Sequence, residues 1–223
     1  MARKPADQSV NRDDILVAAA DVLRDNGYDA TTMKDIAARV NLTAASLYHH
    51  FKSKDFLLLA VLELGLNHAI SELEPIAQSG ELSCAEKLRR MIRAHIVNVT
   101  ENTAVGAAMV FEIKALQLAS FNGRGSGEAD IDKQREFITR RDTFFERRDY
   151  FEKLFRQTIR DGITSGEFRS VDAAIVAKAM LGAHNWVGVW YQPSGRLTGE
   201  EVAAIMADTF LVSLTATHAA PTG

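Results

Sequence analysis

Helix start and stop signals recur along the whole sequence, and no segment shows the alternation of polar and apolar residues that is typical of a strand. Side chains suited to capping a helix N-terminus precede each of several apolar-periodic segments: Asn11, Thr32, Thr43, Ser53 and Thr198. Only 4 prolines are present. The sequence therefore predicts an all-α fold. We expect about nine helices, over residues 12–26, 33–39, 44–50, 54–74, 87–100, 105–121, 131–161, 171–191 and 199–216.

Three breaks are expected between these helices. Pro75 should limit the fourth helix, residues 122–127 are rich in glycine and are expected to form a loop, and Gly162 should end the long charged helix. The chain is 47% hydrophobic and contains a single cysteine, Cys84, so no internal disulfide is possible. A chain of 223 residues can bury its core without such a staple.

The segment from Met33 to Phe51 carries two short helical patterns joined by a tight turn at residues 40–42. Ala37 is small enough to let the two helices cross closely, and Leu47 is expected in their shared core. Asn41 tolerates the left-handed backbone that the turn needs. This spacing is typical of a helix-turn-helix, whose second helix lies in the major groove of DNA. The alternative is a plain helical hairpin.

The charge distribution supports the first interpretation. The net charge is −3, which excludes a uniformly basic nucleic-acid-binding protein. However, the stretch from Arg39 to Lys54 contains Arg39, Lys52 and Lys54 and no acidic residue. A locally basic surface of this kind gives salt-dependent affinity for phosphates.

The run SLYHHFKSKD at residues 46–55, together with Gly27-Tyr28, Thr31-Thr32 and Ile36-Ala37, resembles the N-terminus of the TetR family of transcriptional regulators. The family usually has glycine where this chain has Asn41, and asparagine is a conservative substitute in backbone terms. The resemblance implies a helix-turn-helix DNA-binding domain at residues 1–55. It also implies a ligand-binding and dimerisation domain at residues 56–223.

The resemblance also assigns roles to individual residues of the DNA-binding domain. Thr31 or Thr32, Tyr48 and Lys54 match positions that hold DNA phosphates. The exposed face of the recognition helix is expected to meet base edges through four further residues: Thr43, Ala44, Ser46 and His49. The partner is then a double-stranded, palindromic operator, because the family binds DNA as a homodimer.

The remaining helices are expected to sense a ligand and to dimerise. The family resemblance implies that the last two helices form a four-helix bundle with those of a second copy. Residues 173–191 are apolar nearly all round, which requires cover on more than one side. Polar and aromatic candidates for a mainly apolar pocket are His68, His95, Phe111, Phe144, Phe151, Phe155, Asn185, Trp186 and Trp190. For each histidine and asparagine, an ordinary core position is the alternative.

Residues 148–155 (RDYFEKLF), 166–168 (GEF), 181–186 (LGAHNW) and 190–191 (WY) look like the C-terminal half of TetR-type repressors of fatty-acid and steroid catabolism. That resemblance implies an acyl-coenzyme A ligand. Arg147 and Arg148, with Arg135, Arg140 and Arg141, are candidates for clamping its phosphates. Acidic residues are interleaved with these arginines, so a solvated charged face is the alternative. A different hydrophobic molecule, such as a drug sensed by an efflux regulator, and no ligand at all also remain open.

Other classes of protein fit the sequence less well. It contains no glycine-rich phosphate loop after a strand, no nucleophile elbow and no zinc-protease motif, so we expect no enzyme activity, no cofactor and no metal. A helical module that binds only protein has no need for an acid-free recognition helix. The most apolar long window, residues 173–191, is interrupted by Lys178, so we expect no membrane segment and a cytoplasmic protein.

Overall fold

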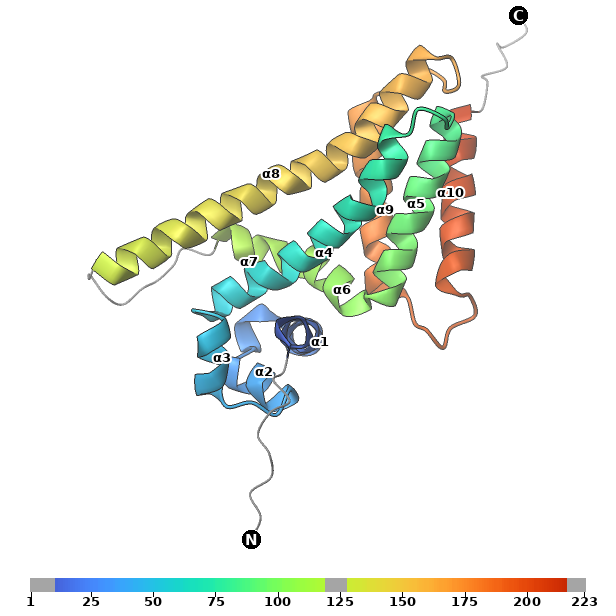
Figure 1. Cartoon of the computed structure of the whole chain (residues 1–223). Helices are drawn as coiled ribbons and strands as arrows, with labels where there is room; N and C mark the ends of the chain where they lie inside the picture. Colours follow the sequence, from blue (N-terminus) through green and yellow to red (C-terminus); the bar gives the residue numbers. More distant parts are fainter. Residues whose placement is uncertain (1–10, 119–127, 216–223) are drawn as a thin grey trace, which may run out of the picture.

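The computed structural model describes residues 11–118 and 128–215. Within these residues the chain forms ten α-helices and no β-strand, so the prediction of an all-α fold is confirmed (Figure 1). The helices are α1 (Arg12–Ala30), α2 (Met33–Arg39), α3 (Ala44–His50), α4 (Lys54–Gln78), α5 (Cys84–Glu101), α6 (Thr103–Phe111), α7 (Ile113–Leu118), α8 (Glu128–Thr164), α9 (Ala173–Trp190) and α10 (Gly199–Thr215).

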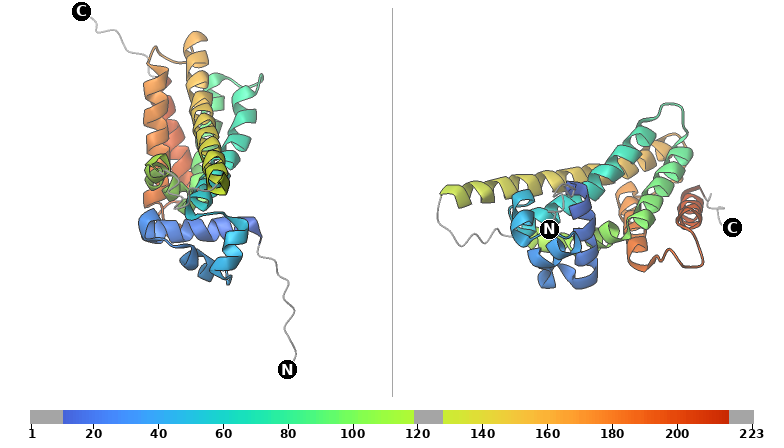
Figure 2. Two further views of the ribbon diagram at one scale, coloured as in Figure 1. Left: turned by 90° about the vertical axis from the view of Figure 1, so that its left-hand side faces the viewer. Right: turned by 60° about the horizontal axis from the view of Figure 1, so that its bottom comes forward.

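The first three helices form a small module around its own part of the core. The predicted capping box is present at the start of α2, where Thr32 accepts from the backbone N–H of Asp35 and the Asp35 carboxylate accepts from that of Thr32. Asn41, between α2 and α3, has the expected left-handed backbone with φ of 56°. Ala37 and Leu47 are buried where the two helices cross. α1 lies across the lower ends of the upright helices (Figure 2).

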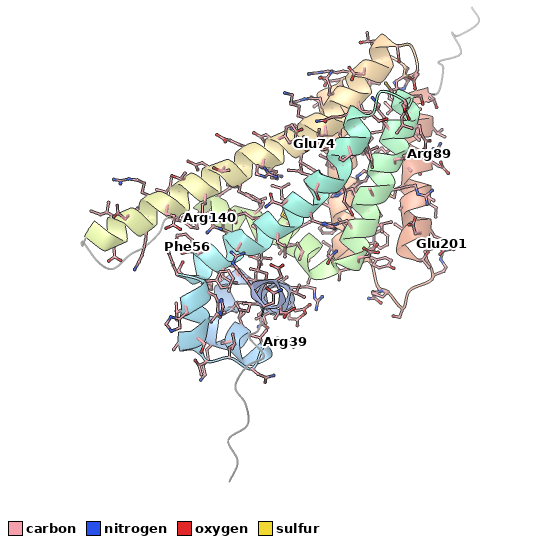
Figure 3. The ribbon with its side chains drawn as sticks, in the orientation of Figure 1. Arg39, Phe56, Glu74, Arg89, Arg140 and Glu201 are labelled. Atoms are coloured by element: carbon pink, nitrogen blue, oxygen red, sulfur yellow. The ribbon has the colours of Figure 1, made fainter. Side chains whose placement is uncertain are left out.

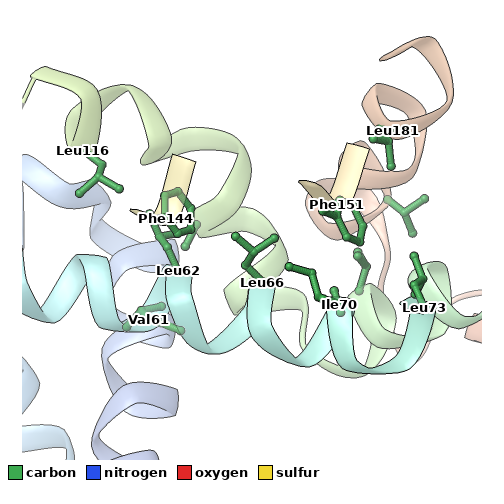
Figure 4. Close-up of a cluster of buried hydrophobic side chains, with 14 of the residues drawn as sticks. Val61, Leu62, Leu66, Ile70, Leu73, Leu116, Phe144, Phe151 and Leu181 are labelled. Carbon is green, nitrogen blue, oxygen red and sulfur yellow. The ribbon is translucent and has the colours of Figure 1, made fainter. Parts of the chain in front are cut away.

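Helices α4, α5, α8, α9 and α10 form the larger bundle above this module (Figure 1). One side of α4 carries Leu66, Ile70 and Leu73, which face Phe144 and Phe151 of α8 (Figure 4). α10 packs along α5, and ion pairs of Arg89 with Asp208 and of Arg93 with Glu200 join the two helices. Figure 3 labels Arg89 at this contact.

α4 is, among the described residues, the helix that is long and apolar enough to cross a membrane by length and composition. Most of it is buried against α1, α5 and α8. Its apolar residues are accounted for by this core packing.

The structure differs from the prediction in several places where a helix was expected to end or to continue. The first helix was expected to end at residue 26, but α1 continues to Ala30 past a kink at Gly27. The single helix expected at residues 105–121 is divided at Glu112 into α6 and α7, which raises the number of helices in the described residues from nine to ten. Residues 119–121 of that helix and the loop expected at 122–127 lie outside the described residues. α4 continues three residues past Pro75, to Gln78. The proline removes one backbone hydrogen bond, but the last turn of the helix still forms. α8 likewise continues past Gly162 to Thr164, and the residue with positive φ that follows it is Gly166.

Gly162 has a packing role instead of a terminating one. A Cβ atom added to it would lie 2.2 Å from the ring of Phe168, which is buried. A second close approach joins α6 to α9, where a Cβ on Gly188 would lie 3.2 Å from the carbonyl carbon of Gly106. These glycines let a ring and a helix pack where a side chain would not fit.

Candidate DNA-reading surface and ligand cavity

The recognition helix α3 presents a polar outer face. Thr43, Tyr48 and His49 are exposed, and Tyr48 is 53% exposed despite its aromatic ring. Ala44 and Ser46 are half-buried at the start of the helix. The Thr43 hydroxyl caps α3 by accepting from the backbone N–H of Ser46 at 3.0 Å, and it lies 2.9 Å from the Ser46 hydroxyl. Two hydroxyls and one phenol are therefore held in defined positions on an accessible helix.

A polar joint connects this module to α6. We define the Glu112 joint as Tyr28, Lys54, Asp55 and Glu112. The Glu112 carboxylate, 8% exposed, accepts from the backbone N–H of Tyr28 at 3.1 Å, just after Gly27, whose φ of 74° kinks α1. The Tyr28 hydroxyl donates to Asp55. Burial raises the pKa of both the Glu112 carboxyl and the Tyr28 phenol, and Asp55 raises that of Tyr28 further.

A cavity of about 380 Å³ lies between α4, α5, α6, α8 and α9. Its apolar wall is formed by Leu66, Val99, Val105, Met109, Phe151 and Leu181. Figure 4 shows Leu66, Phe151 and Leu181 approaching one another from three helices. The volume falls within the range of small-molecule sites. Four charged side chains also line it: Arg148, Asp149, Glu152 and Lys178. Arg148, Asp149 and Lys178 are exposed to solvent, so they mark the open side of the cavity.

Two buried histidines lie at the inner side. His95 lines the cavity, and its Nε2 lies 3.2 Å from Oδ1 of Asn185. The ring of His184, which is fully buried, lies 5.6 Å from that of His95, and both rings contact Phe155 edge-on. Burial lowers the pKa of His95 to about 4 and that of His184 well below its usual value. Both imidazoles are therefore neutral near pH 7.

This burial predicts loss of stability in mild acid. In the unfolded chain both histidines take up a proton near pH 6.5, whereas the folded chain resists protonation until about pH 4 for His95. The contribution of the two neutral histidines to folding stability is therefore fully present above pH 6.5 and is lost as the pH falls towards 4. The His95 shift alone corresponds to about 2 kcal/mol of unfolding free energy between pH 7.5 and 5.

Urea unfolding across that pH range measures the loss. His184→Phe should flatten the pH dependence of the unfolding free energy, while the exposed His68→Gln should leave it unchanged. Equal slopes in the parent chain and both variants would contradict the prediction.

Comparisons with known proteins agree with this architecture. Residues 15–61 match the family model described as bacterial regulatory proteins of the tetR family, and residues 138–214 match a tetracyclin repressor-like C-terminal domain. The crystal structure of the TetR-family transcriptional regulator PfmR from Thermus thermophilus is 31% identical, with a TM-score of 0.72, over 88% of this chain and 96% of that one. The chain belongs to the TetR family of transcriptional regulators.

Two further relatives of this TetR-family chain are similar over most of their length. The repressor KstR2 of Mycolicibacterium smegmatis is 28% identical over 200 residues, which are 89% of this chain and 87% of KstR2. The structure of AibR in complex with isovaleryl coenzyme A and operator DNA is 26% identical, with a TM-score of 0.68, and covers 92% of this chain and 97% of that one. The chain is therefore a DNA-binding transcriptional regulator, as the sequence predicted.

Two residues that the TetR resemblance placed on DNA have other partners. Thr31 is 1% exposed, and its hydroxyl donates to the backbone carbonyl of Gly27 at 2.7 Å, so it is engaged within the module. The Lys54 ammonium donates to the carbonyls of Tyr28 and Thr31 at 2.8 and 2.9 Å and lies 4.1 Å from the Tyr28 ring centre. Both side chains hold the end of α1. Thr32 is exposed.

The basic surface predicted around the recognition helix is also smaller than the sequence suggests. Lys52, just after α3, forms an ion pair with Glu136 of α8. Nearby, the Arg140 guanidinium lies 5.8 Å from the centre of the Phe56 ring, and its ion pair with Glu63 joins α8 to α4. Figure 3 labels Arg140 and Phe56. Arg39 is exposed on α2. The ion pair with α8 therefore offsets the positive charge of Lys52, which the sequence had suggested was available for DNA.

The predicted pocket residues are distributed over several places. Four line the cavity: His95, Arg148, Phe151 and Asn185. Phe144 and Phe155 are buried in the neighbouring core. The prediction is wrong for the remaining pocket candidates, because they do not line the cavity. His68 is exposed and lies 3.5 Å from Glu72, since it occupies the outer face of α4.

Three aromatic candidates point outward instead of into the cavity. Trp186 is 52% exposed, Trp190 and Phe111 are similarly exposed, and the rings of Phe111 and Trp186 lie 6.2 Å apart at an edge-to-face angle. Asn185 lines the cavity while its neighbour Trp186 faces outward, because successive residues of a helix point about 100° apart. Periodicity alone does not show which side an all-apolar helix turns to the core.

The arginine-rich helix α8 is mostly a paired, solvated surface. Of the five arginines considered as a clamp, Arg148 alone lines the cavity. Arg147 donates to Oδ1 of Asn67 at 2.8 Å in a separate surface depression. Arg135, Arg140 and Arg141 pair with Asp132, Glu63 and Asp142 respectively. The alternating charges of the sequence therefore indicated a solvated face for most of these residues.

Sequence reasoning missed the Glu112 joint and most of the cavity lining, including the polar residues Asn98 and Lys178. Asn98 follows His95 by three residues on α5, so helical spacing was a usable signal. Glu112 had no such signal, because its partner Tyr28 lies 84 residues away in the chain.

Proposed function

We propose that this regulator is a repressor that leaves its operator when a small molecule fills the cavity. The observation that carries the proposal is that one helix serves both sites. Val105, Gly106 and Met109 of α6 line the cavity, and Glu112, directly after α6, bonds to the backbone of α1. A ligand that displaces α6 would shift α1 and the module that α1 supports.

The geometry of a dimer makes such a shift consequential. Helix-turn-helix dimers read half-sites one helical turn of DNA apart, about 34–36 Å, so a small tilt of each module removes the match. We place the division of the chain at residues 1–55 for the DNA-binding domain and 56–223 for ligand binding and dimerisation. α4, which begins at Lys54, is the continuous connection between the two.

We further propose that residues at the start of α2 and at the start and along the outer face of α3 contact the operator. The set is Thr32, Thr43, Ala44, Ser46, Tyr48 and His49. Thr32, Thr43, Tyr48 and His49 are exposed, which supports their inclusion, while Thr31 and Lys54 are left out because of their internal bonds.

Tyr48→Phe is expected to weaken binding to every DNA sequence by about three- to tenfold, because it removes one hydrogen bond to a phosphate. His49→Ala is expected to change which base is preferred at one position of each half-site. Fluorescence anisotropy with an operator library measures both. A change of base preference with Tyr48→Phe would contradict its assignment to a phosphate.

A homodimer through α9 and α10 completes the proposal. Ile175, Trp186 and Trp190 of α9 and Ile205 and Val212 of α10 are large, apolar and exposed. Large apolar side chains exposed in such number on two neighbouring C-terminal helices are typical of an interface. A dimer with two-fold symmetry also fits a palindromic operator.

An acyl-coenzyme A thioester is the ligand class that we favour. AibR binds isovaleryl coenzyme A, and KstR2 is a repressor of similar sequence. In this chain the cavity would take the acyl group, and the nucleotide would lie across the open side, near Arg148 and Lys178. Lys178 already bonds to Glu152 at 2.8 Å, which leaves Arg148 as the principal phosphate contact. A hydrophobic drug is the second candidate, because the wall is mainly apolar and the charges at the opening balance.

Titration of operator complexes with short- and medium-chain acyl-coenzyme A esters tests the function directly. We expect operator affinity to fall by about 5- to 150-fold at saturation, and ester affinity to fall by the same factor when operator is bound. Arg148→Ala should weaken ester binding about tenfold, with Arg147→Ala as the matched control. Unchanged operator affinity with esters and with a panel of hydrophobic drugs would overturn the proposal.

We also place the protein in the cytoplasm, where its DNA target lies, and assign it no catalytic role. Its family consists of transcriptional regulators.

A further inference from the structure

Two polar atoms at the inner side of the cavity have no hydrogen-bond partner. They are Nδ1 of His95 and Nδ2 of Asn98, and both are closed off from bulk water. His95 itself is only 6% exposed. The two residues stand one turn apart on α5, and both belong to the cavity wall. Buried polar groups in proteins are normally paired, so a molecule bound in the cavity gains affinity if it can pair with both atoms.

The contacts of His95 decide what each atom requires. Nε2 faces Oδ1 of Asn185, and a carboxamide oxygen only accepts hydrogen bonds, so the proton of the neutral ring is on Nε2. Nδ1 is then a lone pair that needs a donor. Nδ2 of Asn98 is a donor that needs an acceptor. A single group that pairs with both atoms must therefore both donate and accept a hydrogen bond.

The surroundings exclude a charged group at this position. The Phe151 ring lies 5.1 Å from that of His95, with Phe155 and His184 behind it, and these neighbours hold the imidazole in its neutral form. A carboxylate only accepts, so it would face the His95 lone pair without forming a bond. The charged lining residues Arg148, Asp149, Glu152 and Lys178 come from α8 and α9, not from α5.

We propose that the ligand carries a hydroxyl group that donates to Nδ1 of His95 and accepts from Nδ2 of Asn98. A hydroxyl is the smallest group that both donates and accepts. The inference rests on the proposed function, because it assigns a chemical feature to the ligand of the same cavity. It makes the sensed molecule an apolar chain or ring that is hydroxylated at its buried end.

Isothermal titration of the full chain, without DNA, with four matched probes tests this. The probes are p-pentylphenol, p-pentylacetophenone, pentylbenzene and p-pentylbenzoate. We expect the phenol to bind about tenfold more tightly than pentylbenzene, and the ketone and the carboxylate to gain less. Asn98→Leu and His95→Phe should each abolish the preference for the phenol. Asn67→Leu, a matched change on the exposed face of α4, should keep it.

Three results would overturn the hydroxyl assignment: a ketone or carboxylate that binds as tightly as the phenol, a preference that survives in Asn98→Leu, or no binding of any probe. If His95→Phe does not fold, Asn98→Leu still decides the matter. Operator binding and its response to coenzyme A esters are measured on the same preparations. They can succeed while the hydroxyl preference fails, so the two failures are distinguishable.

Discussion

A Trp186→Arg variant is expected to be monomeric and to bind its operator at least about 100-fold more weakly than the parent chain. Trp186 is 52% exposed at the centre of the apolar face of α9, between Ile175 and Trp190. Tryptophan at such a position is a typical interface hot spot, and an arginine would bury an unpaired charge against the partner. Losing the dimer removes the second half-site contact, which is why the operator affinity falls so far.

Analytical ultracentrifugation and operator anisotropy measure the two effects together. Ile138→Arg on α8 is the matched control, since it places the same charge on another exposed apolar position. The control should remain dimeric. A Trp186→Arg protein that stays dimeric would show that α9 does not carry the interface.

A Glu112→Ala variant is expected to bind ligand and operator but to lose most of the coupling between them. The carboxylate that joins the end of α6 to the Tyr28 backbone would be absent, so movement of α6 would no longer be passed to α1. We expect the factor by which ligand weakens operator binding to fall from the typical range of about 5–150 towards one. The unpaired Tyr28 N–H should also cost about 1–3 kcal/mol of stability.

Glu112→Gln separates geometry from charge in the same position. It keeps an acceptor for the Tyr28 N–H without the charge, so coupling should be largely retained if the hydrogen bond carries it. Glu101→Ala, on the exposed end of α5, controls for loss of a carboxylate elsewhere. Full coupling in Glu112→Ala would place the signal on another path, such as α4.

Local signals predicted most of the helices because their causes lie within a few residues. The capping side chains Thr32, Thr43 and Ser53, and the left-handed Asn41, each act on neighbouring backbone, and each was found where the sequence placed it. Gly162 misled the prediction for the opposite reason. Its smallness serves a contact with Phe168 across a turn, which helix propensity does not contain.

The candidate sites were predicted less completely than the helices. His95 and Asn185 were recognised as inward polar residues, and they come together although they are 90 residues apart. Trp186 and Phe111 were assigned to the pocket because they are aromatic, yet they lie on the outside. An aromatic ring is equally suited to a core, a pocket wall and a subunit interface, so residue type alone cannot choose among them.

The sequence by itself determined the all-α fold, the helix-turn-helix and the family, since these depend on periodicity, capping and a contiguous motif. The tertiary structure decided which polar residues meet. It turned Lys54 and Thr31 inward to hold α1, paired Lys52 with Glu136, and joined Glu112 to Tyr28. The physical reason is that hydrogen bonds and ion pairs are short-ranged, so a side chain's partner is set by how the helices pack and not by its position in the chain.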